Sequence, residues 1–89
     1  MKRIQRTTQF KRDVSRAKRR NRNLKKLREV LHWLEEGVKL PASYRDHALV
    51  GQYKGTRECH LEPDWLLIYE ASGEDVILIR TGSHSDLFR

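Results

Sequence analysis

The stretch that decides the fold covers residues 57–80 and reads RECHLEPDWLLIYEASGEDVILIR. Apolar and polar side chains alternate over its first five residues, as they do in a strand with one buried face. Residues 65–70 and 76–79 are nearly continuous apolar runs, which is typical of more deeply buried strands. Turn residues around Pro63 and Gly73 separate the three segments. The stretch therefore predicts a meander of three antiparallel strands.

The residues before this stretch show helical spacing instead. Apolar side chains recur at helical intervals from Phe10 to Ala17, with charged residues between them. Thr7 or Thr8 can cap the start of this segment, because a threonine oxygen can accept a hydrogen bond from a free amide of the first turn. The pattern predicts a first helix.

A second helix is expected from Leu24 to about Glu36, with Asn23 as its N-cap and Gly37 at its left-handed end. Residues 2–6 are interpreted as a short first strand, whereas residues 39–55 show no period and are interpreted as a loop. The fold class expected is α+β. An N-terminal strand and a two-helix hairpin would pack on a mainly antiparallel sheet of about four strands, in one domain over residues 1–89.

Charge is distributed unevenly along the chain. Thirteen of the 19 basic residues lie in residues 1–28, where Asp13 is the single acid, and the net charge of the chain is +7. A concentrated cationic surface attracts polyanions through counterion release and electrostatic steering. We expect the helices to bind nucleic acid, the alternative being a solvated face that only keeps the protein soluble. The candidate contacts are Lys11, Arg12, Arg16, Lys18, Arg19, Arg20, Arg22, Lys25 and Lys26.

The composition argues against several classes of protein. No run of about 18 apolar residues could span a membrane, so no membrane partner is expected. No apolar segment of the kind found in secretory signals follows the basic N-terminus, and we expect a cytoplasmic protein. The single cysteine, Cys59, cannot form an internal disulfide, which suits a reducing compartment.

Three histidines lie in or beside the predicted sheet. His47 belongs to the preceding loop, His60 to the outward face of the first meander strand, and His84 follows the last strand. In an antiparallel meander, the end of the third strand returns to the end of the first hairpin. We therefore expect His60 and Asp64 to lie close to Arg80 and His84, with the loop bringing His47 to the same end of the sheet.

These residue types suit the transesterification of a phosphodiester. Histidine titrates near neutral pH and can take a proton from a 2′-hydroxyl or give one to a 5′-oxygen leaving group. Arg80 would stabilise the charge on the phosphoryl oxygens, because a guanidinium stays cationic and can contact two oxygens at once. Such a route needs no cofactor and no metal, and none is expected.

Other interpretations of these residues remain open. Zinc could bind histidine and aspartate, but the spacing matches no short metal-binding motif, and the nearest pair, His60 and Asp64, spans a turn. Cys59 could be a nucleophile, although its inward position favours a core residue. A single histidine on a strand is usually only a surface or capping residue.

Further residues are candidates for contact with the substrate. Phe88 has no core spacing and could stack on a base, or it could fix the C-terminal tail to the sheet. Trp65, at the start of a strand, could stack on a base or belong to the core. Lys54 could contact a phosphate or only shape its loop.

The order of these residues resembles a known family. Residues 46–65, DHALVGQYKGTRECHLEPDW, and residues 80–88, RTGSHSDLF, resemble the central and C-terminal signatures of the YafQ branch of the RelE toxin superfamily. The resemblance covers most of residues 44–88, and the N-terminal half agrees in layout. Tyr53 stands where a tryptophan is common in this branch, which affects the expected codon preference more than the expected activity.

The resemblance implies a RelE-like fold and a function. Toxins of this branch cut messenger RNA in the ribosomal A site, leave a 2′,3′-cyclic phosphate, and are silenced by a cognate antitoxin. It also implies site residues: the catalytic residues would be His47, His60, Asp64 and His84, with Arg80 stabilising the phosphate and Phe88 holding a base. The basic helices would then bind ribosomal RNA, and the free toxin would be a monomer.

Two rival functions differ from this expectation. A nucleic-acid- or ribosome-binding module without catalysis would need the basic half of the chain but not the three histidines. A relative of the ParE branch, which poisons DNA gyrase, would lack this set of histidines.

Overall fold

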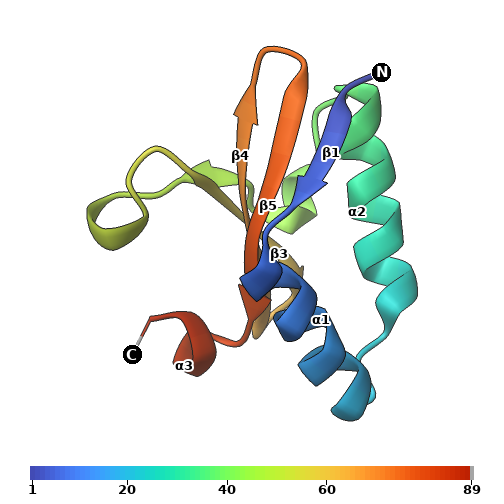
Figure 1. Cartoon of the computed structure of the whole chain (residues 1–89), viewed down its shortest axis with the longest axis vertical. Coiled ribbons are helices and arrows are strands. Elements are labelled where there is room, and N and C mark those ends of the chain that lie inside the picture. Colours follow the sequence, from blue (N-terminus) through green and yellow to red (C-terminus); the bar gives the residue numbers. More distant parts are fainter. Residues whose placement is uncertain (89) are drawn as a thin grey trace.

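The centre of the sheet is β4 (Trp65–Ser72), the apolar run that the sequence places in the middle of the meander. In the computed structural model, which describes residues 1–88, β4 pairs antiparallel with β3 (Arg57–Glu62) on one side and β5 (Asp75–Gly82) on the other. The outer strands are β1 (Arg3–Arg6), parallel to β5, and β2 (His47–Ala48), antiparallel to β3. The predicted meander and α+β class are confirmed (Figure 1).

The sheet has five strands, in the order β1-β5-β4-β3-β2, whereas about four were expected. The additional strand is β2, which is only two residues long and lies in the segment interpreted as a loop. A strand this short has no period to read in the sequence. Pairing with β3 fixes it, and the rest of the segment holds two 3-10 turns, η1 (Ala42–Tyr44) and η2 (Gly51–Tyr53).

Two helices precede the sheet, and their ends follow local signals. In α1 (Thr8–Arg19), the Thr7 side chain accepts a hydrogen bond from the amide of Phe10. In α2 (Leu24–Glu36), Asn23 accepts one from Lys25, and Gly37 closes the helix with a φ of 73°. Both predicted caps and the predicted left-handed glycine are therefore confirmed.

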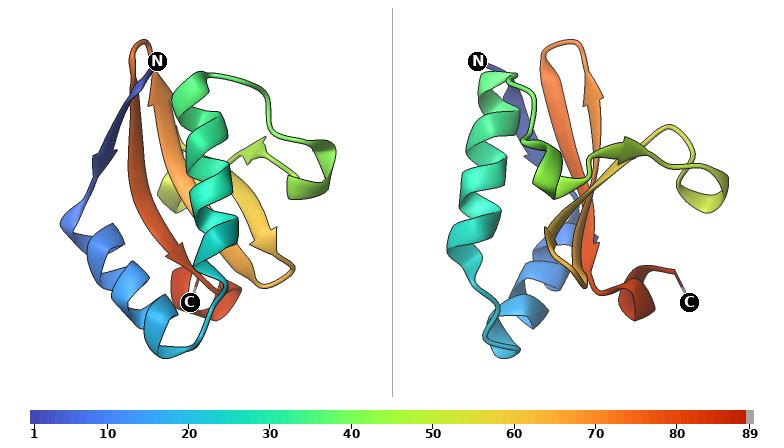
Figure 2. Two further views of the ribbon diagram at one scale, coloured as in Figure 1. Left: turned by 90° about the vertical axis from the view of Figure 1, so that its right-hand side faces the viewer. Right: turned by 180° about the vertical axis from the view of Figure 1, so that it is seen from behind.

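The two faces of the sheet have different coverings (Figure 2). Helices α1 and α2 cover one face, where the main core includes Phe10, Val30 and Leu67. On the other face, the loop before β3 and the short helix α3 (His84–Leu87) enclose a smaller cluster around Leu66 and Ile68. No helix in the described part of the chain is long and apolar enough to cross a membrane. The second face is the one that carries the histidines.

A β-bulge in β5 changes the direction of Arg80. Strict alternation would place Arg80 on the same face as the buried Val76 and Leu78. The register shifts, however, because Ile68 of β4 pairs with Arg80 while the next residue, Tyr69, pairs with Leu78. The extra residue in β5 puts Arg80 opposite Ile68, on the face of the smaller cluster. The bulge therefore brings an arginine to the histidine side of the sheet.

Candidate functional site

Four aromatic rings form a row along one end of the sheet. The ring centroids of His47 and His60 are 6.3 Å apart, those of His60 and His84 are 5.9 Å apart, and those of His84 and Phe88 are 6.4 Å apart. Their carriers are β2, β3, α3 and the residue that follows α3. The three histidines expected to meet do lie together, although they come from distant parts of the sequence.

Asp64 holds His84 at two points. Its Oδ1 atom is 2.6 Å from Nδ1 of the His84 ring and accepts a hydrogen bond of 2.9 Å from the His84 backbone amide. The backbone hydrogen bond, followed by the side-chain one, lowers the pKa of Asp64 below its usual value. An ionised carboxylate on Nδ1 favours a tautomer that leaves Nε2 of His84 free for chemistry. Asp64 thus orients a histidine.

Glu58 supports His47 in a similar way, although its place in the sequence did not single it out. The Glu58 side chain is buried, and its Oε2 atom lies 2.9 Å from Nε2 of His47. Its Oε1 atom has no hydrogen-bond partner in the described part of the chain. The alternating pattern of β3 placed Glu58 and His60 on one face, so the sequence indicated a carboxylate beside one imidazole. The approach of His47 depends on the pairing of β2 with β3.

His47, Glu58 and His60 could also hold a cation. One ligand atom of each residue lies within 4.8 Å of the others. Two imidazoles and a carboxylate are ligands that Zn²⁺ and related metals accept, and three protein ligands leave a position for water or substrate. This donor set differs from the His60 and Asp64 pair considered from the sequence. Asp64 is engaged with His84 instead.

A buried carboxylate fixes Arg80. Asp13 of α1 has no solvent-exposed side-chain surface, and its Oδ2 accepts a hydrogen bond of 2.7 Å from Nε of Arg80. A second bond of 3.2 Å joins Nη2 to Oδ1. The hydrogen bond to Asp13 raises the pKa of Arg80, which therefore stays cationic. Asp13 was not predicted as part of the site, because as an isolated acid in a basic helix it carried no motif.

The loop before β3 is joined to the C-terminal segment by Tyr53. The Tyr53 hydroxyl donates a hydrogen bond of 3.2 Å to the Leu87 carbonyl, and its ring meets that of Phe88 edge-on at 5.5 Å. Phe88 is nevertheless 43% exposed, so one part of its ring is available to a ligand. Lys54, the third candidate for substrate contact, follows η2 and is exposed to solvent.

Trp65 and Cys59 are core residues in this structure. Trp65 is 1% exposed, which favours the core alternative over base stacking, and Arg22 covers its ring at 5.7 Å. Cys59 is fully buried, and burial raises the pKa of its thiol to about 12. A thiol that stays protonated is a poor nucleophile, so the structure argues against a catalytic cysteine.

The nine candidate basic residues fall into two groups. Four form ion pairs that tie the helices to the site end of the sheet: Arg16 and Arg20 with Asp86, and Arg22 and Lys26 with Glu62. The other five are exposed on α1 and α2 and have no ion-pair partner within residues 1–88: Lys11, Arg12, Lys18, Arg19 and Lys25. We call this second group the free cations.

Comparison with known proteins identifies the family. The family model described as "Bacterial toxin of type II toxin-antitoxin system, YafQ" matches residues 2–89. The chain belongs to the YafQ family. The mRNA interferase toxin YafQ of Escherichia coli K12 is 40% identical over 86 residues, which cover 96% of this chain and 94% of the relative. The match includes the basic helices, so membership in the YafQ family extends beyond the C-terminal signatures.

Solved structures of relatives have the same fold. The E. coli DinJ–YafQ complex contains a chain that is 38% identical, with a TM-score of 0.92 and full coverage of both chains. A metal-bound toxin from Helicobacter pylori is also 38% identical, with a TM-score of 0.91 and coverage of 99% of this chain and 100% of that one. The RelE-like architecture expected from the resemblance is thus confirmed for this YafQ family member.

Proposed function

We propose that this chain is a ribosome-dependent endoribonuclease, the toxin of a type II toxin–antitoxin pair. The observation that carries the proposal is the row of three imidazoles beside Phe88, with one imidazole oriented by Asp64. A relative 40% identical over nearly the whole chain is an mRNA interferase, and a close structural neighbour is a toxin seen in complex with its partner DinJ. A cognate antitoxin is the corresponding partner here.

The proposed reaction is a transesterification within the RNA strand. A 2′-oxygen attacks the adjacent phosphorus, and the bond to the 5′-oxygen of the next nucleotide breaks, which leaves a 2′,3′-cyclic phosphate. One imidazole accepts the 2′-hydroxyl proton and another donates a proton to the departing 5′-oxygen. Neighbouring rings whose centroids lie about 6 Å apart can contact opposite sides of one phosphate.

Arg80 and Phe88 would hold the substrate during this reaction. Asp13 accepts from Nε and from one hydrogen of Nη2, so both hydrogens of Nη1 and the second hydrogen of Nη2 are left for phosphoryl oxygens. The exposed part of the Phe88 ring lies beside His84 and could stack on a base next to the scissile bond. The free cations on the helices would bind ribosomal RNA while the sheet end meets the message.

The test compares the 5′ ends of cellular messages after induction of the wild type, His60→Ala, His84→Ala and a control, His32→Ala. His32 is a histidine of α2 outside the row. We expect cuts at a fixed position within codons for the wild type and the control. Cleavage should fall by about a hundredfold or more in each site variant, because positioned acid–base groups contribute at least that much. Growth arrest without cuts, unchanged in both site variants, would instead support a non-catalytic ribosome-binding module.

Metal independence needs its own test, because His47, Glu58 and His60 can hold a cation and a relative is metal-bound. The protein is stripped with a chelator and assayed on programmed ribosomes in a buffer that contains Mg²⁺ but no transition metal. We expect full cleavage. Loss of activity on stripping, restored by Zn²⁺ or Cu²⁺, would show that cleavage requires a bound metal and that the metal-independent mechanism is wrong.

A further inference from the structure

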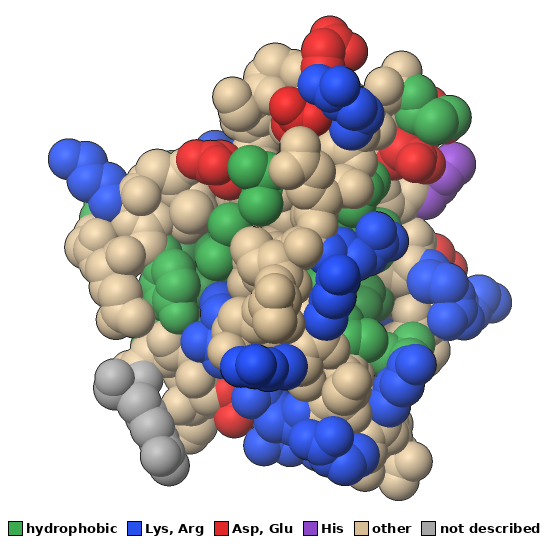
Figure 3. All heavy atoms as spheres, in the orientation of Figure 1, with side chains coloured by type: hydrophobic (Ala, Val, Ile, Leu, Met, Phe, Trp, Pro, Cys, Tyr) green, Lys and Arg blue, Asp and Glu red, His purple; other side chains and the backbone are tan. Residues whose placement is uncertain are grey.

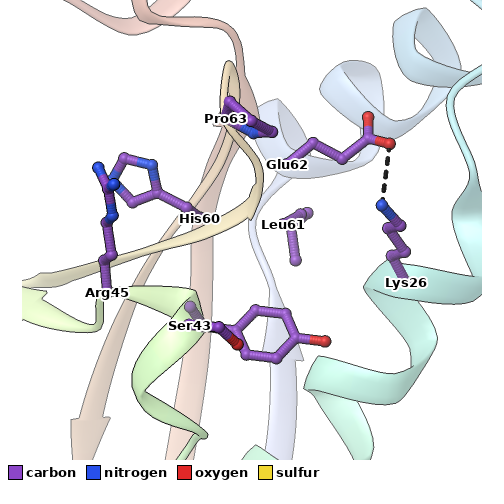
Figure 4. A pocket seen from close by; sticks show the side chains of 8 residues that line it. Lys26, Ser43, Arg45, His60, Leu61, Glu62 and Pro63 are labelled. Atoms are coloured by element: carbon purple, nitrogen blue, oxygen red, sulfur yellow. Dashed lines mark hydrogen bonds and ion pairs between the residues drawn. The ribbon is translucent and has the colours of Figure 1, made fainter.

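A cavity of about 360 Å³ opens beside His60, between β3, η1 and the start of α2 (Figure 4). This volume lies near the lower end of the roughly 300–1,000 Å³ typical of ligand sites. His60 and Arg45 both line it, and Lys26 and Glu62 form part of the wall and are joined by an ion pair of 3.2 Å. Of the residues assigned to the proposed reaction, only His60 lines this cavity, and the reaction as described gives the cavity no role.

Arg45 differs from the other arginines near the site. Arg80 is bound by Asp13, Arg57 by Asp46, and Arg22 by Glu62. The Arg45 side chain is exposed and makes no ion pair with any carboxylate of residues 1–88. Its guanidinium therefore has its donors available for an anion in the cavity.

The backbone of Arg45 is held in an unfavourable conformation. Its φ of 50° and ψ of 44° lie in the left-handed region, which costs roughly 1–2 kcal/mol for a residue with a side chain. The neighbouring Asp46 anchors this segment, since it accepts hydrogen bonds from Nε of Arg57 and from the Tyr69 hydroxyl. Glycine or asparagine would adopt this conformation more easily, so an arginine here indicates a use for its side chain.

We propose that this cavity binds the nucleotide next to the scissile phosphate, and that Arg45 contacts the phosphate of that nucleotide. The inference rests on the proposed ribonuclease function and extends it. Phe88 lies at the His84 end of the ring row, whereas the cavity lies against His60. An RNA strand with its reacting phosphate between these two histidines would have one neighbouring nucleotide at Phe88 and the other at Arg45. The exposed ring of Pro63 provides an apolar surface for its base.

Arg45 would be a positioning residue, and a double-mutant cycle on programmed ribosomes tests this. The message carries a neutral methylphosphonate at one of the two phosphates that flank the scissile one. For the wild type, we expect one of these two replacements to raise the half-saturating toxin concentration about tenfold, as removal of a charge-assisted hydrogen bond should. Arg45→Ala should show the same rise on the natural message and no further rise with that methylphosphonate. Arg45→Lys should recover part of the affinity.

The controls separate this inference from the function on which it rests. Arg3→Ala removes an equal charge from β1, where Arg3 pairs with Asp75, and should leave the half-saturating concentration unchanged. Ser43→Phe places a ring in the cavity wall and should weaken binding without altering the fold. The inference would be overturned, with ribonuclease activity intact, by either of two results. In the first, the effects of Arg45→Ala and of the methylphosphonate on the half-saturating concentration multiply at both flanking phosphates. In the second, Arg45→Ala has the same half-saturating concentration as the wild type. A wild type that cuts no message would overturn the proposed function itself.

Discussion

Asp13 shows how a single buried residue can organise the site. Its side chain is fully enclosed, yet it accepts hydrogen bonds from Arg80, from the Thr81 amide and from Gln9. Because β1 ends opposite Leu78, the edge of β5 beyond that point has no strand partner in β1, and side chains of Thr7, Arg16 and Asp13 bind its backbone groups. Asp13 accepts from one of these amides and simultaneously holds the arginine. Sheet edge and site are therefore stabilised by the same carboxylate.

We expect Asp13→Asn to lower the free energy of unfolding by about 3 kcal/mol, because the change leaves the charge of Arg80 without its buried partner. Denaturant titration measures this decrease. The matched control is Asp75→Asn, which breaks the exposed pair with Arg3 and should cost less than about 1 kcal/mol. Equal costs for the two variants would contradict the structural role given to Asp13.

Cys59 permits a second test at the residue scale. Burial raises the pKa of its thiol from 9.0 to about 12, so the thiolate is scarce at pH 8 in the folded protein. We expect iodoacetamide to leave the native protein unmodified at pH 8 and to alkylate it rapidly in denaturant, as mass spectrometry would show. Cys59→Ala should keep full cleavage activity. Rapid alkylation of the native protein would mean that the thiol is accessible and reactive.

At the scale of elements, α3 depends on its cap more than on its length. The helix is four residues long, and a capping box joins Ser83 and Asp86 at its start. Asp86 also accepts a hydrogen bond of 2.7 Å from Arg20 of α1. Gly82 allows this close packing, since a Cβ there would lie 2.9 Å from Cβ of Asp86. Because His84 begins this helix, the cap positions a proposed catalytic imidazole.

Asp86→Asn should destabilise the protein by about 1–2 kcal/mol at neutral pH. The hydrogen bond from Arg20 is the main reason that the pKa of Asp86 lies far below its usual value. A depressed carboxyl pKa stabilises the fold above the unfolded-state pKa, which is about 3.9, and this contribution disappears as the pH falls further. The difference between variant and wild type should therefore shrink below about pH 4. Thermal unfolding from pH 7 to pH 3 checks this, with exposed Ser85→Ala as the control.

How far the elements could be predicted depended on whether their signals were local. The caps at Thr7 and Asn23 act within one turn of helix, and both were readable in the sequence. The two-residue strand that carries His47 exists only through pairing with β3, and the bulge that redirects Arg80 depends on the register against β4. Periodicity in the sequence does not encode these non-local features. The histidine cluster was predictable because meander topology alone brings strand ends together.

At the scale of the whole molecule, charge is divided between structure and surface. The ion-paired cations connect α1, α2 and the turn between them to the acidic residues that flank the histidine row, namely Glu62 and Asp86. The free cations instead face solvent on α1 and α2. Figure 3 shows Lys and Arg side chains gathered over the end of the molecule that carries α1. The basic residues of this region thus include an ion-paired group and an exposed group that composition could not separate.

Two variants that remove the same charge should therefore behave differently. Lys18→Ala with Arg19→Ala removes free cations and should weaken ribosome binding while leaving the melting temperature unchanged. The magnitude of the slope of log K against log salt should fall by about 0.7–0.9 for each RNA phosphate that the variant no longer neutralises.

Arg20→Ala with Arg22→Ala removes paired cations and should lower the melting temperature, because Asp86 and Glu62 lose partners. Salt-dependent binding and thermal unfolding of both variants test the division. Equal losses of affinity and of stability in the two variants would contradict this division, because the free and the ion-paired cations would then contribute in the same way to binding and to folding.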